Sequence, residues 1–354
     1  MNSKERVATA LRGEQPDRVP IVDLVDLPSL VKLATALRLP IPEQGERFAE
    51  QELACRLVLK LGLDGIFMPD PLGFEESDEH RVRDRFGSVY KTSRYGDEPD
   101  LIEGPIGSLE DIQGFDAALS VLPEDFDAAR LTRDLLGPSY PLMMWLNSPF
   151  KLSWRLRGSM QELLVDYVRR PALVHALARA TTDLVLALIE GAAGAGMDVI
   201  MLAGDIAGEQ APMFSLRHFR EYLRPYYEEV VDAAHARGLP VIYHSDGNMW
   251  PFMEDLIEIG FDGNNPIQPQ CMDIAEAKVK LGSRICLVGN IDCRDLLCFG
   301  TEDEVEQAVK ETLAVAAPGG GYMLCSSNSI HPDVPPQNYI AMVRAGQAYG
   351  GYSS

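Results

Sequence analysis

The chain has 354 residues, 46% of them hydrophobic and 24% charged, which is an ordinary balance for a globular protein with a large apolar core. Its 53 acidic and 32 basic residues give a formal net charge of -21, so a nucleic acid is not an expected partner, because a phosphate backbone would be repelled. No apolar run reaches the roughly 18 residues of a membrane span, and six cysteines without CxxC spacing do not make a disulfide scaffold. The amphipathic N-terminus lacks the apolar core of a signal peptide, and we expect a cytoplasmic protein.

The first part of the chain alternates amphipathic helices with apolar strands. We expect helices at 3–12 and 44–61, each followed by a strand that ends in a carboxylate, at 19–23 and 63–70. From about 71 to 139 the chain becomes rich in Gly, Pro and Asp, with alternating polar and aromatic residues. We interpret this stretch as an irregular insertion, a hairpin or an excursion, rather than a separate core.

The alternation of strands and helices resumes near residue 141. The expected strands are 141–147, 198–205, the stretch 239–248 with its polar end, 261–266, 284–292 and 319–328, and the expected helices are 160–169, 172–195, 215–237, 250–259, 273–281, 302–317 and 336–349. Such alternation implies parallel strands with right-handed crossovers, and eight strands are the number that closes into a filled barrel. We predict one (β/α)8 TIM barrel domain over 1–354, with the insertion after the second strand covering the barrel mouth. An open doubly wound sheet is the alternative, but no GxGxxG follows an early strand.

Polar residues follow the expected strands at the ends where a barrel carries its chemistry. They are Asp23, Asp70, Asn147, Asp205, His244, Asp246, Asn264, Asn290, Asp292 and the segment Cys325–Asn328. His244 and Asp246 stand out, because both follow an apolar run closely enough to point into the mouth. The aspartates could instead cap helices, and the asparagines could satisfy loop backbone.

Some of these residues are of the types that bind metal ions. His244, Asp246, Cys325 and Glu209 are eligible zinc ligands, although they come from separate loops and their spacing carries little specificity. Cys325 could also act as a nucleophile with His244, the commoner alternative being a buried thiol in a strand. Tyr243 is expected either to line an apolar pocket or to pack in the core.

Four motifs spread over nearly the whole chain resemble the uroporphyrinogen decarboxylase superfamily. They are Arg6–Glu14 with Pro16–Pro20, the Asp205 strand with Pro212–Ser215, the turn His244–Asn248, and Gly319–Tyr322 with Pro335–Asn338. The resemblance implies an α/β barrel and one of two chemistries. One is cofactor-free decarboxylation in tetrapyrrole synthesis, and the other is methyl transfer between a corrinoid protein and a small methyl donor or acceptor, usually assisted by zinc.

The decarboxylase chemistry is the less favoured of the two. The resemblance places an arginine-rich, substrate-binding segment at Val22–Pro28, but the segment here has no arginine and two aspartates. A substrate with many carboxylates would be repelled there at short range. The catalytic aspartate of that branch corresponds to Asp70 and its late histidine to Asn328, so only one of the two is kept.

The methyltransferase branch binds zinc through a His-x-Cys motif and a later cysteine. These correspond to His244-Ser245-Asp246 and to Asn328, with Cys325 three residues earlier. The resemblance therefore implies a cation held by His244, Asp246 and Cys325, in a harder site than one with two thiolates. A thiol such as coenzyme M is then not the expected acceptor.

We expect an enzyme that moves a methyl group between a small O- or N-methyl compound and a corrinoid protein. His244 and Asp246, or a metal that they hold, would assist the leaving heteroatom, and Asp205 and Asp70 would orient the substrate. The other expected substrate-binding residues are Asp23, Asn147, Tyr243, Asn264, Asn290 and Asn328. A non-catalytic binding barrel is the remaining alternative.

Overall fold

Eight parallel strands form one sheet in the computed structural model, which describes residues 1–43, 47–77, 81–92, 99–113, 115 and 120–352. Their order in the sheet is β1 (Val22–Asp23), β2 (Gly65–Met68), β7 (Met143–Asn147), β8 (Val199–Ala203), β9 (Val241–His244), β10 (Gly263–Asn265), β11 (Cys286–Ile291) and β12 (Tyr322–Ser326). The two edges meet where the Leu324 amide donates to the Pro20 carbonyl at 2.9 Å, beside a parallel bridge between Ile21 and Leu324. The prediction of a (β/α)8 TIM barrel is confirmed.

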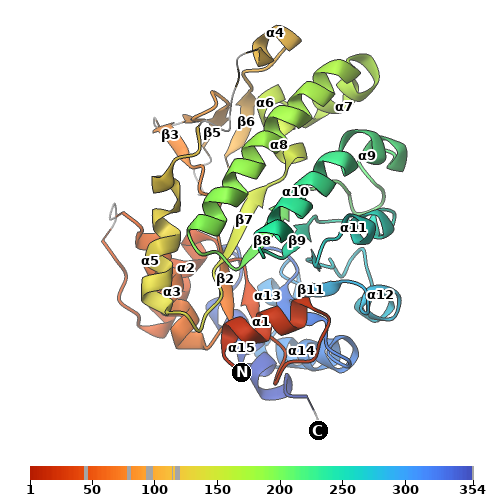
Figure 1. Cartoon of the computed structure of the whole chain (residues 1–354). Coiled ribbons are helices and arrows are strands. Elements are labelled where there is room, and N and C mark those ends of the chain that lie inside the picture. The colour runs from red at the N-terminus through yellow and green to blue at the C-terminus, as the bar shows by residue number, and fades with distance from the viewer. Residues whose placement is uncertain (44–46, 78–80, 93–98, 114, 116–119, 353–354) are drawn as a thin grey trace.

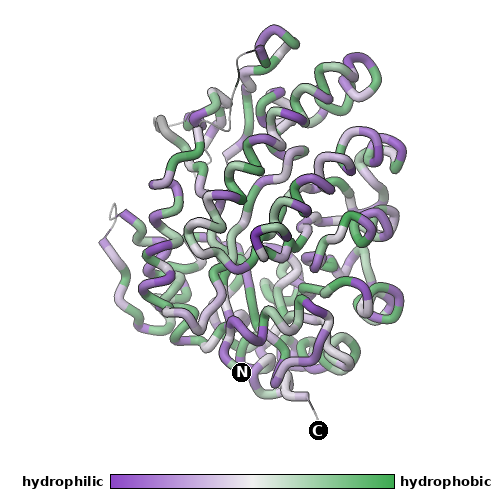
Figure 2. Tube along the Cα trace, viewed as in Figure 1, coloured by the Kyte–Doolittle hydropathy of each residue, from purple (hydrophilic) through white to green (hydrophobic). Residues whose placement is uncertain are grey.

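Helices surround the barrel (Figure 1). They are α1 (Ser3–Leu11), α2 (Leu27–Leu37), α3 (Ala49–Leu61), α5 (Asp127–Leu136), α6 (Pro149–Arg157), α7 (Met160–Arg169), α8 (Pro171–Gly194), α9 (Leu216–Tyr222), α10 (Arg224–Ala236), α11 (Met253–Ile259), α12 (Ile274–Leu281), α13 (Leu296–Phe299), α14 (Glu302–Ala316) and α15 (Pro336–Tyr349). Hydrophobic and hydrophilic residues alternate along their turns (Figure 2). In α10 the buried residues are Tyr227, Val230, Val231 and Ala234, the spacing of one helical face.

The single helix expected at 215–237 is two helices, α9 and α10, in the structure. Pro225 lies in the first turn of α10, where its missing amide hydrogen leaves no helical hydrogen bond unmade. Helix α8 is the one helix among the described residues that is long and apolar enough to cross a bilayer, but 56% of its most apolar window is buried against the rest of the protein. That is the position of a core helix.

The barrel interior is a filled apolar core that α1 closes from below. Side chains from alternate positions of the strands meet inside, among them Phe67, Met201 and Met323, and Val7 and Leu11 of α1 pack against the same cluster. The N-terminal end of the barrel is therefore sealed by apolar contacts, which leaves the opposite end for polar residues.

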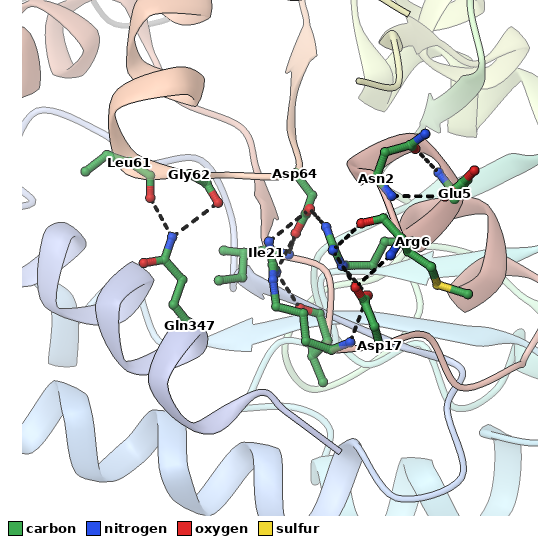
Figure 3. Close-up of polar contacts among 12 residues, drawn as sticks. Asn2, Glu5, Arg6, Asp17, Ile21, Leu61, Gly62, Asp64 and Gln347 are labelled. Atoms are coloured by element: carbon green, nitrogen blue, oxygen red, sulfur yellow. Dashed lines mark hydrogen bonds and ion pairs between the residues drawn. The ribbon is translucent and has the colours of Figure 1, made fainter. Parts of the chain in front are cut away.

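A buried ionic network fastens α1 to the barrel (Figure 3). The fully buried Asp64 carboxylate accepts hydrogen bonds from Arg6 Nη1 at 2.6 Å, Arg18 Nη1 at 2.7 Å and the Ile21 amide at 2.9 Å. Arg6 also donates through Nε to Asp17 at 2.7 Å. The first motif of the resemblance thus has a structural role at the barrel floor, because its arginines hold the N-terminal helix in place.

The inserted segment is more regular than the irregular excursion expected from its sequence. It contains an antiparallel sheet of β3 (Phe74–Ser77), β4 (Arg81–Asp84), β5 (Val89–Lys91) and β6 (Asp100–Glu103), followed by α4 (Leu109–Ile112) and α5. The segment contacts α6, since Ser88 Oγ donates to the Arg155 carbonyl and the Ile106 amide to the Leu156 carbonyl. Residues 78–80, 93–98, 114 and 116–119 of the predicted insertion lie outside the described residues.

Candidate metal centre

Two carboxylates and one imidazole converge at the carboxyl ends of two neighbouring strands. Asp205 follows β8, His244 ends β9, and Asp246 lies two residues further; one ligand atom of each lies within 4.8 Å of the others. The strands hold them in register, because Ala203 of β8 pairs with His244 of β9. His244 Nε2 lies 3.9 Å from Asp205 Oδ1, which also accepts a hydrogen bond from the Asp246 amide at 3.2 Å.

This group fits a divalent cation. Two carboxylates and an imidazole are nitrogen and oxygen ligands of the kind that bind zinc and harder divalent metals. Asp246 Oδ1 is buried yet has no hydrogen-bond partner within the described part of the chain, while Asn328 Nδ2 donates to the other carboxylate oxygen at 2.6 Å. An oxygen buried without a partner is costly unless a ligand meets it. A cation bound between the three side chains would satisfy it.

The surroundings of Asp246 disfavour its negative charge. Burial raises the pKa of Asp246, and the nearby Asp205 carboxylate raises it further, whereas His244, Lys151 and the hydrogen bond from Asn328 lower it. Two carboxylates that face each other in a partly desolvated site are more stable when a positive charge lies between them. The electrostatics therefore point in the same direction as the geometry.

Lys151 is a site residue that the sequence analysis missed. Its ammonium nitrogen lies 4.0 Å from Asp205 Oδ2 and 5.8 Å from the centre of the Trp145 ring. The lysine is in the first turn of α6, which begins directly after β7 because Ser148 caps it by accepting from the Lys151 amide at 3.2 Å. The sequence Ser148-Pro149 carries this helix-start signal, but we expected it only to close the strand.

His244 is held by side chains from β7 and from the neighbouring strand β10. Its ring is buried, lies 4.5 Å from the Trp145 ring between centroids, and places Nδ1 2.6 Å from Asn265 Oδ1. Asn265 was not among the predicted site residues, and the sequence offered its neighbour Asn264 instead. Trp145 therefore contacts the site directly, and Asn265 is the polar partner of the histidine.

Asp70 and Asn147 form a second polar pair at the carboxyl ends of the neighbouring strands β2 and β7. Asp70 Oδ2 accepts from the Asn147 amide at 3.1 Å and from Asn147 Nδ2 at 2.8 Å, and Oδ1 accepts from the Leu72 amide at 2.8 Å. Burial raises the pKa of Asp70, and these hydrogen bonds and the charge of Arg155 oppose the rise. Two predicted site residues are thus brought together, next to the Asp205 group along the sheet.

Cys325 lies outside the group of Asp205, His244 and Asp246, contrary to its expected role as a ligand beside His244 and Asp246. It points to the seam between β12 and β1, where Sγ donates to Asp23 Oδ1 at 3.5 Å. Burial, together with the Asp23 carboxylate, raises the pKa of Cys325 well above its ordinary value, which favours the neutral thiol. Asp205 takes the third place in the group. Glu209 also lies outside the group, since it is exposed and paired with Arg294 at 2.7 Å.

Asp23 is a fully buried carboxyl with neutral hydrogen-bond donors. Its Oδ1 accepts from Ser326 Oγ at 2.6 Å and from the Leu24 amide at 3.0 Å, and burial raises its pKa to about 7. Complete burial is not the position of a residue that meets a substrate from solvent. We therefore correct the substrate-binding role expected for Asp23 to one within the barrel seam.

Tyr243 and Asn264 face away from the barrel interior. Tyr243 donates to the Gly204 carbonyl at 2.6 Å and packs against Phe261 with 5.1 Å between ring centroids. Asn264 pairs in register with Tyr243 and is completely buried, so both side chains point into the layer between strands and helices. Their expected substrate-binding roles are not supported. Asn290, which pairs with Cys325, faces the interior.

Comparison with known proteins places this barrel in a family. The sequence profile of the uroporphyrinogen decarboxylase (URO-D) family matches residues 2–349. The chain is 27% identical over 260 residues to a uroporphyrinogen decarboxylase of Coxiella burnetii, covering 70% of each protein, and 24% identical over 353 residues to the methylcobamide:CoM methyltransferase of Methanosarcina barkeri, covering 98% of each. A solved methyltransferase structure from Methanosarcina mazei superposes with a TM-score of 0.73 over 99% of both chains, at 21% identity. The chain belongs to the uroporphyrinogen decarboxylase family, near its methyltransferase branch.

Proposed function

We propose that the protein is a methyltransferase that moves a methyl group between a small O- or N-methyl compound and a corrinoid protein. The observation that carries this proposal is the convergence of Asp205, His244 and Asp246 at the barrel mouth, where the resemblance places the zinc ligands of the methyltransferases. Similarity to a named methyltransferase along 98% of both chains supports it. The six cysteines are free thiols, which agrees with a cytoplasmic location.

The chemistry requires help for the heteroatom from which the methyl group departs. An alkoxide or amine leaves poorly unless a proton or a Lewis acid reaches it. A divalent cation, with zinc as the first candidate, would supply the Lewis acid when held by Asp205, His244 and Asp246. Lys151 places a positive charge beside the same carboxylates, and the Asp70–Asn147 pair would orient the substrate.

The ligands also bear on the class of acceptor. All three members of the group bind through nitrogen or oxygen, and the thiol of Cys325 is directed to Asp23. Thiolate-rich zinc sites are the soft sites suited to activating a thiol, and this one is harder. We therefore propose an oxygen or nitrogen compound as the small substrate, rather than a thiol such as coenzyme M.

Decarboxylation of a porphyrinogen is the second candidate, and one observation favours it. Asp70, which corresponds to the catalytic aspartate of that branch, is kept at the barrel mouth and held by Asn147. Against it, the segment Val22–Pro28 has no arginine to bind a polyanionic substrate. Asp23 in that segment is buried, so it does not take over this role.

A methyl-transfer assay separates these functions. The purified protein, supplied with Zn²⁺ and reduced free cobalamin in place of a corrinoid protein, is given a panel of methoxy-aromatic compounds and methylamines, and methylation of the cobalamin is followed by absorbance. We expect the wild type to turn over a compound of this panel. In His244→Ala the turnover should fall about 100-fold or more, the scale of a lost acid–base group or metal ligand. Glu209→Ala should leave the turnover unchanged.

Other outcomes of the assay would each point to a different function. If the protein turns over uroporphyrinogen and does not turn over any of the methyl compounds, it is a decarboxylase. Activity that survives His244→Ala in full would show that the Asp205 group is not the site. Inactivity toward both substrate classes would favour a non-catalytic barrel.

A further inference from the structure

We propose that Asn265 is a positioning residue of the candidate metal centre, which fixes the tautomer of His244. In this tautomer the proton lies on Nδ1, and the lone pair of Nε2 is directed to Asp205 and Asp246. The importance of this tautomer for cation binding rests on the proposed function, but the tautomer itself does not. Asn265 lies on β10 directly beside His244, since the two residues pair in register.

The orientation of the Asn265 amide follows from its surroundings. Its Nδ2 lies 3.2 Å from the Val288 carbonyl oxygen and 3.7 Å from Cys325 Sγ. A carbonyl oxygen only accepts hydrogen bonds, so the NH₂ group must face Val288; the reversed amide would bring two oxygens together. The oxygen of the amide is therefore the atom that faces His244.

The amide orientation decides where the histidine carries its proton. Asn265 Oδ1 lies 2.6 Å from His244 Nδ1, and an amide oxygen only accepts, so Nδ1 must be the donor. In a neutral imidazole the other nitrogen then carries a free lone pair. That nitrogen, Nε2, is the atom 3.9 Å from Asp205 Oδ1, on the side of the metal-binding group. Histidines that bind metals through one nitrogen characteristically donate the other N–H to such a partner.

Cys325 contacts Asn265 and so takes part in the same hydrogen-bonded chain as His244. Its sulfur accepts from Asn265 Nδ2 and donates to Asp23 Oδ1. The contacts form a continuous chain from the barrel seam through Asn265 to His244. Cys325 thus supports the asparagine that orients the histidine, instead of binding the cation itself.

Nitrogen NMR of the full-length, metal-free protein tests the tautomer directly. With His244 assigned by comparison with His244→Ala, and at a pH at which the imidazole is neutral, we expect the single ring proton of the wild type on Nδ1. Asn265→Leu removes the acceptor at similar volume and should release this preference. Asn265→Asp keeps the oxygen that accepts from Nδ1 and should retain it, although its second carboxylate oxygen then replaces the NH₂ group that faced the Val288 carbonyl. Asn264→Leu is the matched control, because Asn264 is the neighbouring asparagine that faces the opposite side of the same strand.

Calorimetric titration with Zn²⁺ and Mn²⁺ gives the second readout. We expect Asn265→Leu to bind the cation about 10- to 100-fold more weakly than the wild type, the usual effect of losing a partner of a metal-binding histidine. Asn265→Asp should stay within about tenfold of the wild type on the same scale, and Asn264→Leu should match the wild type.

Two results would overturn the role of Asn265: a wild-type His244 protonated on Nε2, or an Asn265→Leu variant that keeps both the tautomer and the cation affinity. If Asn265→Leu does not fold, the wild-type spectrum and Asn265→Asp still decide. A wild type that binds no cation but has Nδ1 protonated would contradict the proposed metal centre and leave the tautomer assignment standing.

Discussion

Asp23 and Asp64 are both completely buried carboxyls, and their neighbours make them behave differently. Asp64 forms ion pairs with Arg6 and Arg18. Asp23 accepts hydrogen bonds from a hydroxyl, an amide and a thiol, all of them neutral. A buried carboxylate is tolerated when it is paired and is costly when it is not. The two residues should therefore contribute to stability in opposite ways.

The raised pKa of Asp23 predicts a specific dependence of stability on pH. The pKa of Asp23 is about 7 in the folded protein, and its ordinary value is 3.8. Between these two pH values the folded state therefore holds a proton that the unfolded state has released. Its contribution to stability is fully present below about pH 4 and is lost as the pH rises toward 7. The loss is up to about 1.4 kcal/mol per pH unit. In urea unfolding in EDTA, the wild type should lose stability relative to Asp23→Asn as the pH rises from about 4 to 7, and the two profiles should run parallel above that range. Parallel profiles throughout would contradict the prediction.

Removal of Asp64 should destabilise the protein strongly. Asp64→Ala leaves the Arg6 guanidinium, only 9% exposed, without its buried partner, and we expect a loss of about 3–5 kcal/mol in the free energy of unfolding. Glu209→Ala is the control, because it breaks an ion pair with Arg294 in which both side chains are more than half exposed, worth at most about 1 kcal/mol. Equal losses measured by urea denaturation would refute a structural role for the network.

At the level of residues, the sequence identified the polar groups at the ends of strands but not the contacts that side chains make across strands. Asp205, His244 and Asp246 were expected at the mouth because each comes directly after an apolar run. Asn264 was expected there instead of Asn265, because a shift of one residue along a strand moves the side chain to the other face and the sequence does not define that register. Lys151 carried no such signal, since it reaches the site from a helix.

The loops after β8 and β9 pack backbone against backbone, which fixes the separation of the carboxylates that they carry. Gly247 has a φ of +90°, and a Cβ there would lie 2.6 Å from the Ala207 carbonyl oxygen. The Asn248 amide donates to the Gly208 carbonyl at 2.9 Å. This approach requires glycine, for its conformation as well as for its size.

Substitution of Gly247 should therefore disturb the metal centre. Gly247→Ala has to displace one loop from the other, and we expect cation affinity to fall on the order of tenfold, since such sites tolerate shifts of only about 0.5 Å. Gly196→Ala is the matched control: its φ is also positive, at +78°, but nothing lies within 4 Å of the added Cβ. It should reduce stability and leave affinity intact. Calorimetry that gives the same affinity for both variants would contradict this account.

At the level of elements, the barrel strands and long helices were predictable because each has a clear apolar period. One missed helix, α2, does have such a period, since Leu30, Leu33 and Ala34 are buried on one face. Other missed elements lack one. Helix α6 begins directly after a strand, and α13 has only four residues. In the insertion, β4 buries only its second residue, so no apolar run marks it as a strand.

The whole molecule separates stability from chemistry along the barrel axis. The floor is sealed by α1 and by the Asp64 network, and the carboxyl ends of the strands carry the polar groups that converge on the candidate metal centre. The eight-strand count was enough to predict this division. The sequence did not predict that Asp205, rather than Cys325, would join His244 and Asp246. That choice depends on the direction of the Cys325 side chain, which points to the seam between the last strand and the first.

The most direct test of the metal centre is a cation titration of the metal-free protein with Zn²⁺ and Mn²⁺. We predict one cation per chain in the wild type, an affinity at least about 100-fold weaker in Asp205→Ala and His244→Ala, and little change in Cys325→Ser, which keeps a hydrogen-bonding group beside Asn265. A wild type that binds no cation, or an affinity that is lost in Cys325→Ser and kept in Asp205→Ala, would contradict the assignment.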